Sequence, residues 1–149
     1  MRQPIQVLVF CYRETHRGRE YLVLHRQPHA WAFWQPISGG VEDDEELLTT
    51  ARRELQEETG FKSDSLESIG YAYYIPVSHD SQLSQTGADE LIPVNAFAAR
   101  IADGIDPVLD ENEHDDFRWC SADLADRLMF WHNDRESLRR VEAWLRDST

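Results

Sequence analysis

The sequence contains few cysteines and no long apolar run. Two cysteines, Cys11 and Cys120, occur in 149 residues. That is too few for a small disulfide-stabilised scaffold and is typical of reduced thiols in a reducing compartment. No apolar run approaches the roughly 20 residues that a membrane-spanning helix needs. The short apolar run near the N-terminus lacks the small-residue cleavage site of a signal peptide. We therefore expect a cytoplasmic protein that does not enter a membrane.

Positive charge is also scarce. The chain has 15 basic and 28 acidic residues, which gives a formal net charge of −13. Such a chain repels a phosphate backbone, so we expect no nucleic-acid partner. A small phosphorylated substrate stays compatible with this charge, because a bound metal ion reverses the local field.

The remaining composition is that of a folded domain. Hydrophobic residues make up 41% and aromatic residues 11% of the chain, which argues against disorder. The length suits one domain covering residues 1–149. The sequence leaves open whether the protein is a monomer or a homodimer.

Strand-like and helix-like patterns are mixed along the chain. Short β-branched and aromatic runs predict strands, and apolar residues at helical spacing predict helices. This mixture indicates an α+β fold or an α/β/α sandwich. The predicted strands cover residues 5–12, 21–25, 36–38, 66–77, 91–101 and 117–121; the turn and loops cover 13–20, 26–35, 79–90 and 102–116; the helices cover 45–59, a segment after Ser121, and a last helix capped by Asn133 or Asp134.

The most informative part of the sequence is the stretch from residue 39 to residue 61, GGVEDDEELLTTARRELQEETGF, which predicts a helix with defined ends. Asp43 or Asp44 is the predicted helix N-cap, and Gly60 is the predicted stop. Gly39 and Gly40 permit a tight turn with positive φ just before the helix. The helix of this stretch and the last helix of the chain each present an apolar face; the predicted buried residues are Leu47, Leu48, Ala51 and Leu55 in the former and Leu138, Val141, Trp144 and Leu145 in the latter.

Three glutamates crowd one face of this helix. Glu54, Glu57 and Glu58 are related by spacings of three and four residues, so their charges repel one another. Clustered carboxylate oxygens suit Mg²⁺ or Mn²⁺. Arg53 precedes them and can hold carboxylates with its planar guanidinium. The alternative is a solvated helix with ordinary ion pairs.

The complete spacing favours the metal site. Gly39 and Glu45 are followed by Arg53-Glu54-Leu55, by Glu57-Glu58 and by Gly60-Phe61. This pattern resembles the Nudix box, the signature of the Nudix hydrolase family, with Phe61 as a mild variant at its last position.

The resemblance implies a fold and a reaction. Nudix proteins are α/β/α sandwiches around a mixed sheet, and most hydrolyse a nucleoside diphosphate linked to another group with Mg²⁺ or Mn²⁺. Transferred to this sequence, the resemblance implies that Glu54, Glu57 and Glu58 are metal ligands and that Arg53 and Glu45 brace the loop and helix. Water attacks a phosphorus of the pyrophosphate, and Glu57, Glu58 or a residue outside the box accepts its proton.

Shorter motifs resemble one subgroup, the dihydroneopterin triphosphate and dATP pyrophosphohydrolases. Glu113 begins a Glu-His motif before an aromatic-basic-Trp strand and is the candidate base outside the box. Alternatively, Glu113 is one more acid in an acidic loop. Arg26 is either a phosphate-binding residue or a surface charge. The other candidate substrate-binding residues are Trp34, Ser38, Gly39, Trp131 and Asn133.

The leading hypothesis is therefore a metal-dependent pyrophosphohydrolase that converts a nucleoside triphosphate or pterin triphosphate to a monophosphate and pyrophosphate. Trp34 and Trp131 are expected to stack the substrate ring, although Trp31, Phe33 and Trp34 can instead cover the core. Two alternatives remain: a hydrolase of dinucleoside polyphosphates or nucleotide sugars, and a nucleotide-sensing module without catalysis.

Overall fold

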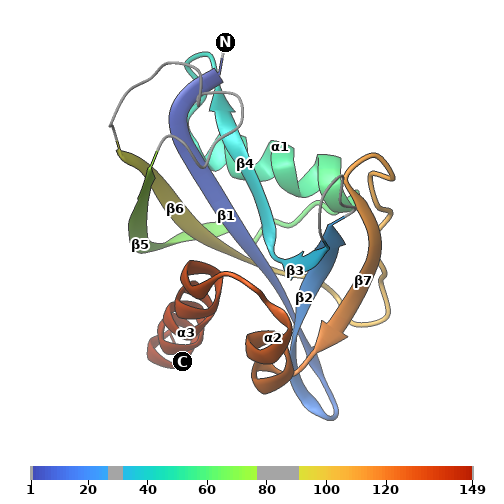
Figure 1. Ribbon diagram of the computed structural model, residues 1–149. Coiled ribbons are helices and arrows are strands. Elements are labelled where there is room, and N and C mark those ends of the chain that lie inside the picture. The colour runs from blue at the N-terminus through green and yellow to red at the C-terminus, as the bar shows by residue number, and fades with distance from the viewer. Residues whose placement is uncertain (1, 27–31, 77–90, 149) are drawn as a thin grey trace.

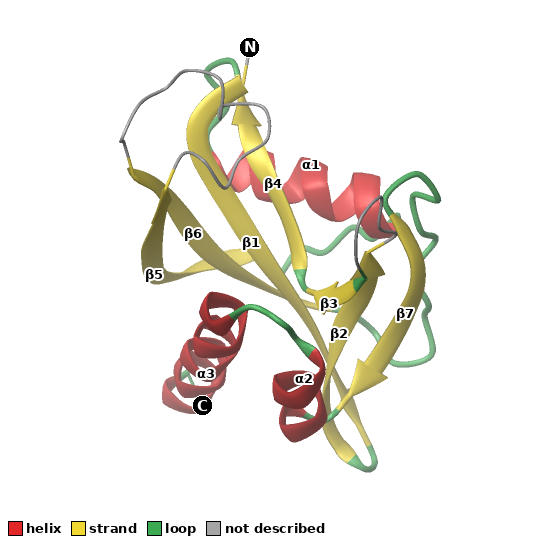
Figure 2. Cartoon of the chain, viewed as in Figure 1, coloured by secondary structure: helices red, strands yellow, loops and turns green. Residues whose placement is uncertain are grey.

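The computed structural model describes residues 2–26, 32–76 and 91–148. A seven-stranded sheet lies between α1 on one face and α2 and α3 on the other (Figures 1 and 2). This arrangement confirms the predicted α+β class. The elements are β1 (Arg2–Thr15), β2 (Gly18–Arg26), β3 (Phe33–Gln35), β4 (Ile37–Glu42), α1 (Leu47–Thr59), β5 (Glu67–Pro76), β6 (Leu91–Arg100), β7 (His114–Cys120), α2 (Ala122–Leu128) and α3 (His132–Asp147).

The sheet is mixed and is built around β1. The main strand order is β3-β2-β1-β6-β5, with β4 also paired to β1 and β7 also paired to β2. β1 runs parallel to β6 and antiparallel to β2 and β4. The long β1 therefore lies between β4, the strand before α1, and β6.

Alternation along β1 divides the core into two clusters. Val7 and Val9 pack with Ala51 and Leu55 beneath α1. Leu8 packs on the opposite face, with the core residues contributed by α2 and α3. Successive side chains of a strand point to opposite faces, so one strand supplies both layers of the core.

Several predicted boundaries were wrong. The segment 13–20 is mostly strand, because β1 and β2 pair as far as Thr15 and Gly18. The segment 26–35 contains β3, and β4 continues through Gly40 to Glu42. In each case pairing with a neighbouring strand, and not the local apolar pattern, sets the limits of the strand. The predicted loop 79–90 and Trp31 lie outside the described residues.

Both long helices begin elsewhere than predicted. The N-cap of α1 is Glu46 and not Asp43 or Asp44. The N-cap of α3 is Trp131 and not Asn133 or Asp134. The C-cap of α1 is Gly60 in the left-handed conformation, as predicted.

The predicted helix faces need two corrections. Leu48 is 38% exposed, so it does not belong to the buried stripe of α1. Trp144 is half-buried and packs against the core, whereas Leu138, Val141 and Leu145 are buried. Within the described residues, none of the helices is long and apolar enough to cross a membrane.

Candidate active site

A cleft of about 760 Å³ brings together residues from most elements of the fold. It is lined by strands of the sheet, by α1, by the segment before β7 and by the first turn of α3. Among the predicted site residues, those that line it are Arg26, Ser38, Gly39, Arg53, Glu54, Glu57, Glu58, Glu113, Trp131 and Asn133.

The three glutamates of α1 differ sharply in burial. Glu58 is only 2% exposed, the Glu54 side chain is 12% exposed and the Glu57 side chain is 56% exposed. Burial raises the pKa of Glu58 well above its usual range, and the charge of Glu54 adds to this shift. Burial also raises the pKa of Glu54. Two crowded, desolvated carboxylates need protons or a cation to share the site.

Arg53 binds both ends of the key stretch. Its Nε and Nη2 donate to Glu45 at 2.9 and 2.8 Å, and Nη2 also donates to the carbonyl of Gly40 at 2.9 Å. Its Nη1 donates to Glu54 at 2.8 Å and to Glu57 at 3.4 Å. The hydrogen bonds from Arg53 lower the pKa of the Glu45 carboxyl to about 2. The guanidinium thus fastens α1 to the end of β4 and orients Glu54.

Replacing Arg53 by lysine tests this brace. An ammonium group cannot reach four partners in the planar geometry of a guanidinium. We expect the free energy of unfolding to fall by about 1–3 kcal/mol, measured by urea denaturation. Arg52→Lys is the matched control, because Arg52 is exposed on the same helix. Equal stability of the two variants would contradict the bracing interpretation.

Gly39 is required because the Glu54 side chain approaches its backbone closely, and not because the chain turns there. Gly39 and Gly40 lie within β4, and neither is among the glycines with positive φ, so the predicted turn was wrong. A Cβ at position 39 would lie 2.0 Å from Cδ and 2.3 Å from Oε1 of Glu54. The absence of a side chain at Gly39 therefore leaves room for a carboxylate of the glutamate cluster.

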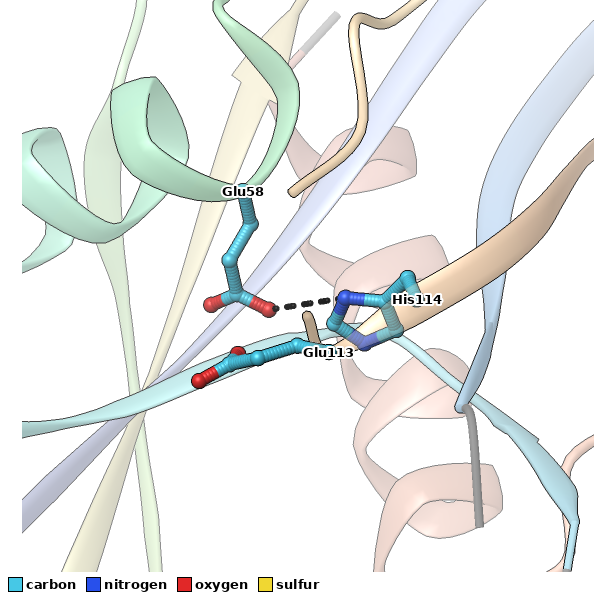
Figure 3. Close-up of side chains that lie close together, drawn as sticks. All are labelled: Glu58, Glu113 and His114. Atoms are coloured by element: carbon cyan, nitrogen blue, oxygen red, sulfur yellow. Dashed lines mark ion pairs between the residues drawn. The ribbon is translucent and has the colours of Figure 1, made fainter. Parts of the chain in front are cut away.

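Glu58 and Glu113 offer carboxylate oxygens that fit a divalent cation, and His114 lies beside them. Their possible ligand atoms all lie within 4.8 Å of one another, at the end of α1 and the start of β7 (Figure 3). Glu58 Oε2 and His114 Nδ1 are buried without a hydrogen-bond partner among the described residues. A buried carboxylate oxygen without a partner is costly, and a cation is a physical means of satisfying it.

Aromatic rings line the cleft near the start of α3. The ring of Phe33 meets that of Trp131 edge-on, with 5.8 Å between centroids. Trp34 is not among the lining residues. It packs against the core on the α2 and α3 side and lies 5.0 Å from the ring of His25. Because Phe33 and Trp34 are neighbours in β3, they point to opposite faces, and Phe33 takes the position predicted for Trp34.

The cleft also contains residues that the sequence did not single out. Gln35 lines it two residues after Phe33, as strand alternation requires. Asp110 and Glu42 add further acids. Asp134, considered only as a helix cap, is a buried cleft residue that is 6% exposed. Gln35 belongs to the Phe33-Trp34-Gln35 motif before the box, and recognising 33–35 as a strand would have placed its side chain in the cleft with that of Phe33.

Asp134 makes the stability of the protein depend on pH. Burial raises its pKa from 3.8 to about 7. Since the folded state holds this proton more tightly than the unfolded state, Asp134 lowers stability increasingly from about pH 4 to pH 7. We expect Asp134→Asn to gain stability over wild type across this range, by up to roughly 4 kcal/mol.

Urea unfolding at several pH values measures this difference. Asp123→Asn is the control, because Asp123 is an exposed acid in the first turn of α2. A constant difference between Asp134→Asn and wild type from pH 4 to pH 8 would contradict the expectation.

The chain is similar to known proteins over most of its length. Residues 2–141 match the NUDIX domain family. The dihydroneopterin triphosphate diphosphatase of Haemophilus influenzae is 31% identical over 143 residues, covering 90% of this chain and 84% of that protein. A NUDIX hydrolase structure from Listeria monocytogenes superimposes with a TM-score of 0.84 at 30% identity, covering 98% of this chain and 97% of the other.

Another relative is much longer than this chain. The octanoyltransferase of Myxococcus xanthus is 30% identical over 129 residues, which are 85% of this chain and 34% of that protein. The present chain thus spans about a third of this relative.

The mixed sheet between helices is a Nudix-type fold, and the acid-lined cleft lies beside its helix α1. The chain belongs to the Nudix family. Nudix hydrolases generally need divalent metal ions, and the acidic cluster is a possible site for one.

Proposed function

We propose that this Nudix hydrolase converts a nucleoside triphosphate or a pterin triphosphate to the monophosphate and pyrophosphate. The observation that carries the proposal is one cleft lined both by the glutamate cluster of α1 and by aromatic side chains. The name of the relative from Haemophilus influenzae, dihydroneopterin triphosphate diphosphatase, supports the pterin alternative.

The acidic part of the cleft is the proposed reaction centre. Glu54, Glu57 and Glu58 would hold Mg²⁺ or Mn²⁺, and the hydrogen bond from Arg53 keeps Glu54 in place. When bound, the cation neutralises the pyrophosphate charge and lowers the pKa of bound water. Glu113 faces the same space as Glu58 and accepts the proton of the attacking water (Figure 3).

The proposed substrate contacts are the other predicted site residues that line the cleft, together with Phe33. Arg26 offers a cation to the phosphates, and the β4 residues Ser38 and Gly39 line the cleft beside Glu54. At the aromatic end, Trp131 is 41% exposed and is available for stacking, with Asn133 as a polar group near the ring. Phe33 replaces Trp34 in this proposal.

The proposed base can be tested with a matched pair of variants. Glu113→Gln keeps the size of the side chain but removes its ability to accept a proton. We expect kcat to fall roughly 10²- to 10⁴-fold. Glu111→Gln is the control, because Glu111 is an exposed acid in the turn before β7. If kcat of Glu113→Gln stayed within a few-fold of the control, Glu113 would be a surface acid and the metal cluster would be unaffected.

The substrate class is tested by product identification. Purified protein with Mg²⁺ is assayed against nucleoside triphosphates, dihydroneopterin triphosphate, dinucleoside polyphosphates and nucleotide sugars. A monophosphate and pyrophosphate from one triphosphate is the expected result. Preferred cleavage of a dinucleoside polyphosphate or a nucleotide sugar would replace the proposal by the first alternative. Binding without turnover of any compound would favour the nucleotide-sensing module.

A further inference from the structure

His114 is buried directly behind the glutamate cluster. Its side chain has no exposed surface, and its Nδ1 lies 3.7 Å from Oε1 of Glu58, whose side chain is 3% exposed. On the other side of the ring, Nε2 lies 3.2 Å from Nε2 of Gln35, which is also buried. The three side chains come from β3, α1 and β7 and form a continuous row from the sheet to the cluster (Figure 3 shows Glu58 and His114).

The amide of Gln35 selects one tautomer of the imidazole. In the orientation of the Gln35 amide that the structure shows, its nitrogen faces the ring and donates, so Nε2 of His114 accepts. In a neutral imidazole the proton is then on Nδ1, the atom that faces Glu58. The opposite orientation of the amide would place the proton on Nε2. The complete burial of the ring favours the neutral imidazole over the charged form.

We propose that His114, held by Gln35, is a positioning residue that directs its Nδ1–H to Oε1 of Glu58 and leaves Oε2 for a divalent cation. This inference rests on the proposed metal site. An ionised Glu58 attracts the Nδ1–H and shortens the present 3.7 Å separation into a hydrogen bond. One oxygen is then engaged by the protein, while the unpartnered Oε2 keeps its lone pairs for the cation.

The backbone of His114 is held by two contacts. The amide of His114 donates to the carbonyl of Asp110 at 2.9 Å. His114 also pairs with Arg26 in the register of β2 and β7, at a local irregularity of the ladder. These contacts fix the point at which the ring is attached, and burial and the Gln35 contact hold the ring itself.

Metal affinity is the direct readout of this arrangement. Mn²⁺ binding to the whole chain is measured by electron paramagnetic resonance without substrate. Loss of an outer hydrogen bond to a metal ligand typically weakens binding roughly 10- to 100-fold, and we expect this loss for His114→Leu. His114→Asn restores a donor near the position of Nδ1 and is expected to recover most of the affinity. Gln35→Met is expected to give an intermediate loss, and His16→Leu, in the exposed β1–β2 turn, none.

Nitrogen-15 NMR of the wild-type imidazole tests the tautomer without any substitution. We expect His114 to carry its proton on Nδ1 in the absence of metal. A proton on Nε2, with Nδ1 shifted by a diamagnetic cation such as Zn²⁺, would make the ring a metal ligand and overturn the proposal. Wild-type Mn²⁺ affinity in both His114 variants would overturn it as well, whether or not Glu57→Gln abolishes binding.

The same binding measurements distinguish a failure of the proposed function from a failure of the His114 inference. If wild type bound no Mn²⁺, the metal site and this inference would fall together. If Glu57→Gln lost Mn²⁺ binding while His114→Leu kept it, the proposed function would stand and only the positioning by His114 would be wrong.

Discussion

Replacing Glu57 by glutamine is expected to lower kcat roughly 10³-fold. Glu57 lines the cleft, and its exposed carboxylate is the proposed metal ligand that solvent and substrate reach most easily. A glutamine amide keeps the shape but removes the charge. A metal ion supplies several kcal/mol of transition-state stabilisation on the phosphoryl oxygens, and each 1.36 kcal/mol corresponds to a tenfold change in rate.

Steady-state kinetics with Mg²⁺ and Mn²⁺ measure this loss. Glu46→Gln is the matched control, because Glu46 is exposed at the N-cap of the same helix and makes no side-chain cap hydrogen bond. The control is expected to keep kcat within a few-fold of wild type. If Glu57→Gln did the same, the metal-site assignment would be wrong.

Replacing Gly39 by alanine is expected to impair the site far more than the fold. The added Cβ would lie 2.0 Å from Cδ of Glu54, so the carboxylate must move. Only the end of a side chain gives way, and we expect a stability loss of about 1 kcal/mol. The displaced carboxylate is a proposed metal ligand held by Arg53, so Mn²⁺ affinity is expected to fall roughly 10- to 100-fold.

A double-mutant cycle separates this clash from other effects of alanine. Glu54→Ala removes the Cγ and Cδ atoms that the new Cβ would meet. Gly39→Ala should therefore cost little further stability in the Glu54→Ala background, as measured by urea unfolding. An undiminished cost in that background would show that the β4 backbone, and not Glu54, excludes a side chain.

Local sequence patterns were enough to predict the end of α1 and the burial of its glutamates. The predicted end of α1 at Gly60 is observed, with Gly60 in the left-handed conformation. Glu58 lies at the buried edge of the apolar stripe and Glu57 furthest from it, as the helical period predicts. These features depend on residues within a few positions of one another, which a sequence displays directly.

Strand limits and strand faces were not predictable in the same way. Gly39 and Gly40 indicate a turn from local preference, yet pairing with β1 keeps them extended. Trp34 and Phe33 have similar apolar character, and pairing of β3 with β2 decides which one faces the cleft. Such choices depend on partners distant in the chain, so they follow from the sheet and not from the local sequence.

The sequence alone determined the family resemblance, the α+β class and the carboxylates expected to bind metal, because the box is a local pattern read along one helix. The tertiary structure alone decided which side chains surround those carboxylates. Gln35, Glu58 and His114 are far apart in the chain, and only the packing of β3, α1 and β7 places them in one row. Burial there raises the pKa of Glu58 and lowers that of His114, because desolvation depends on the whole fold.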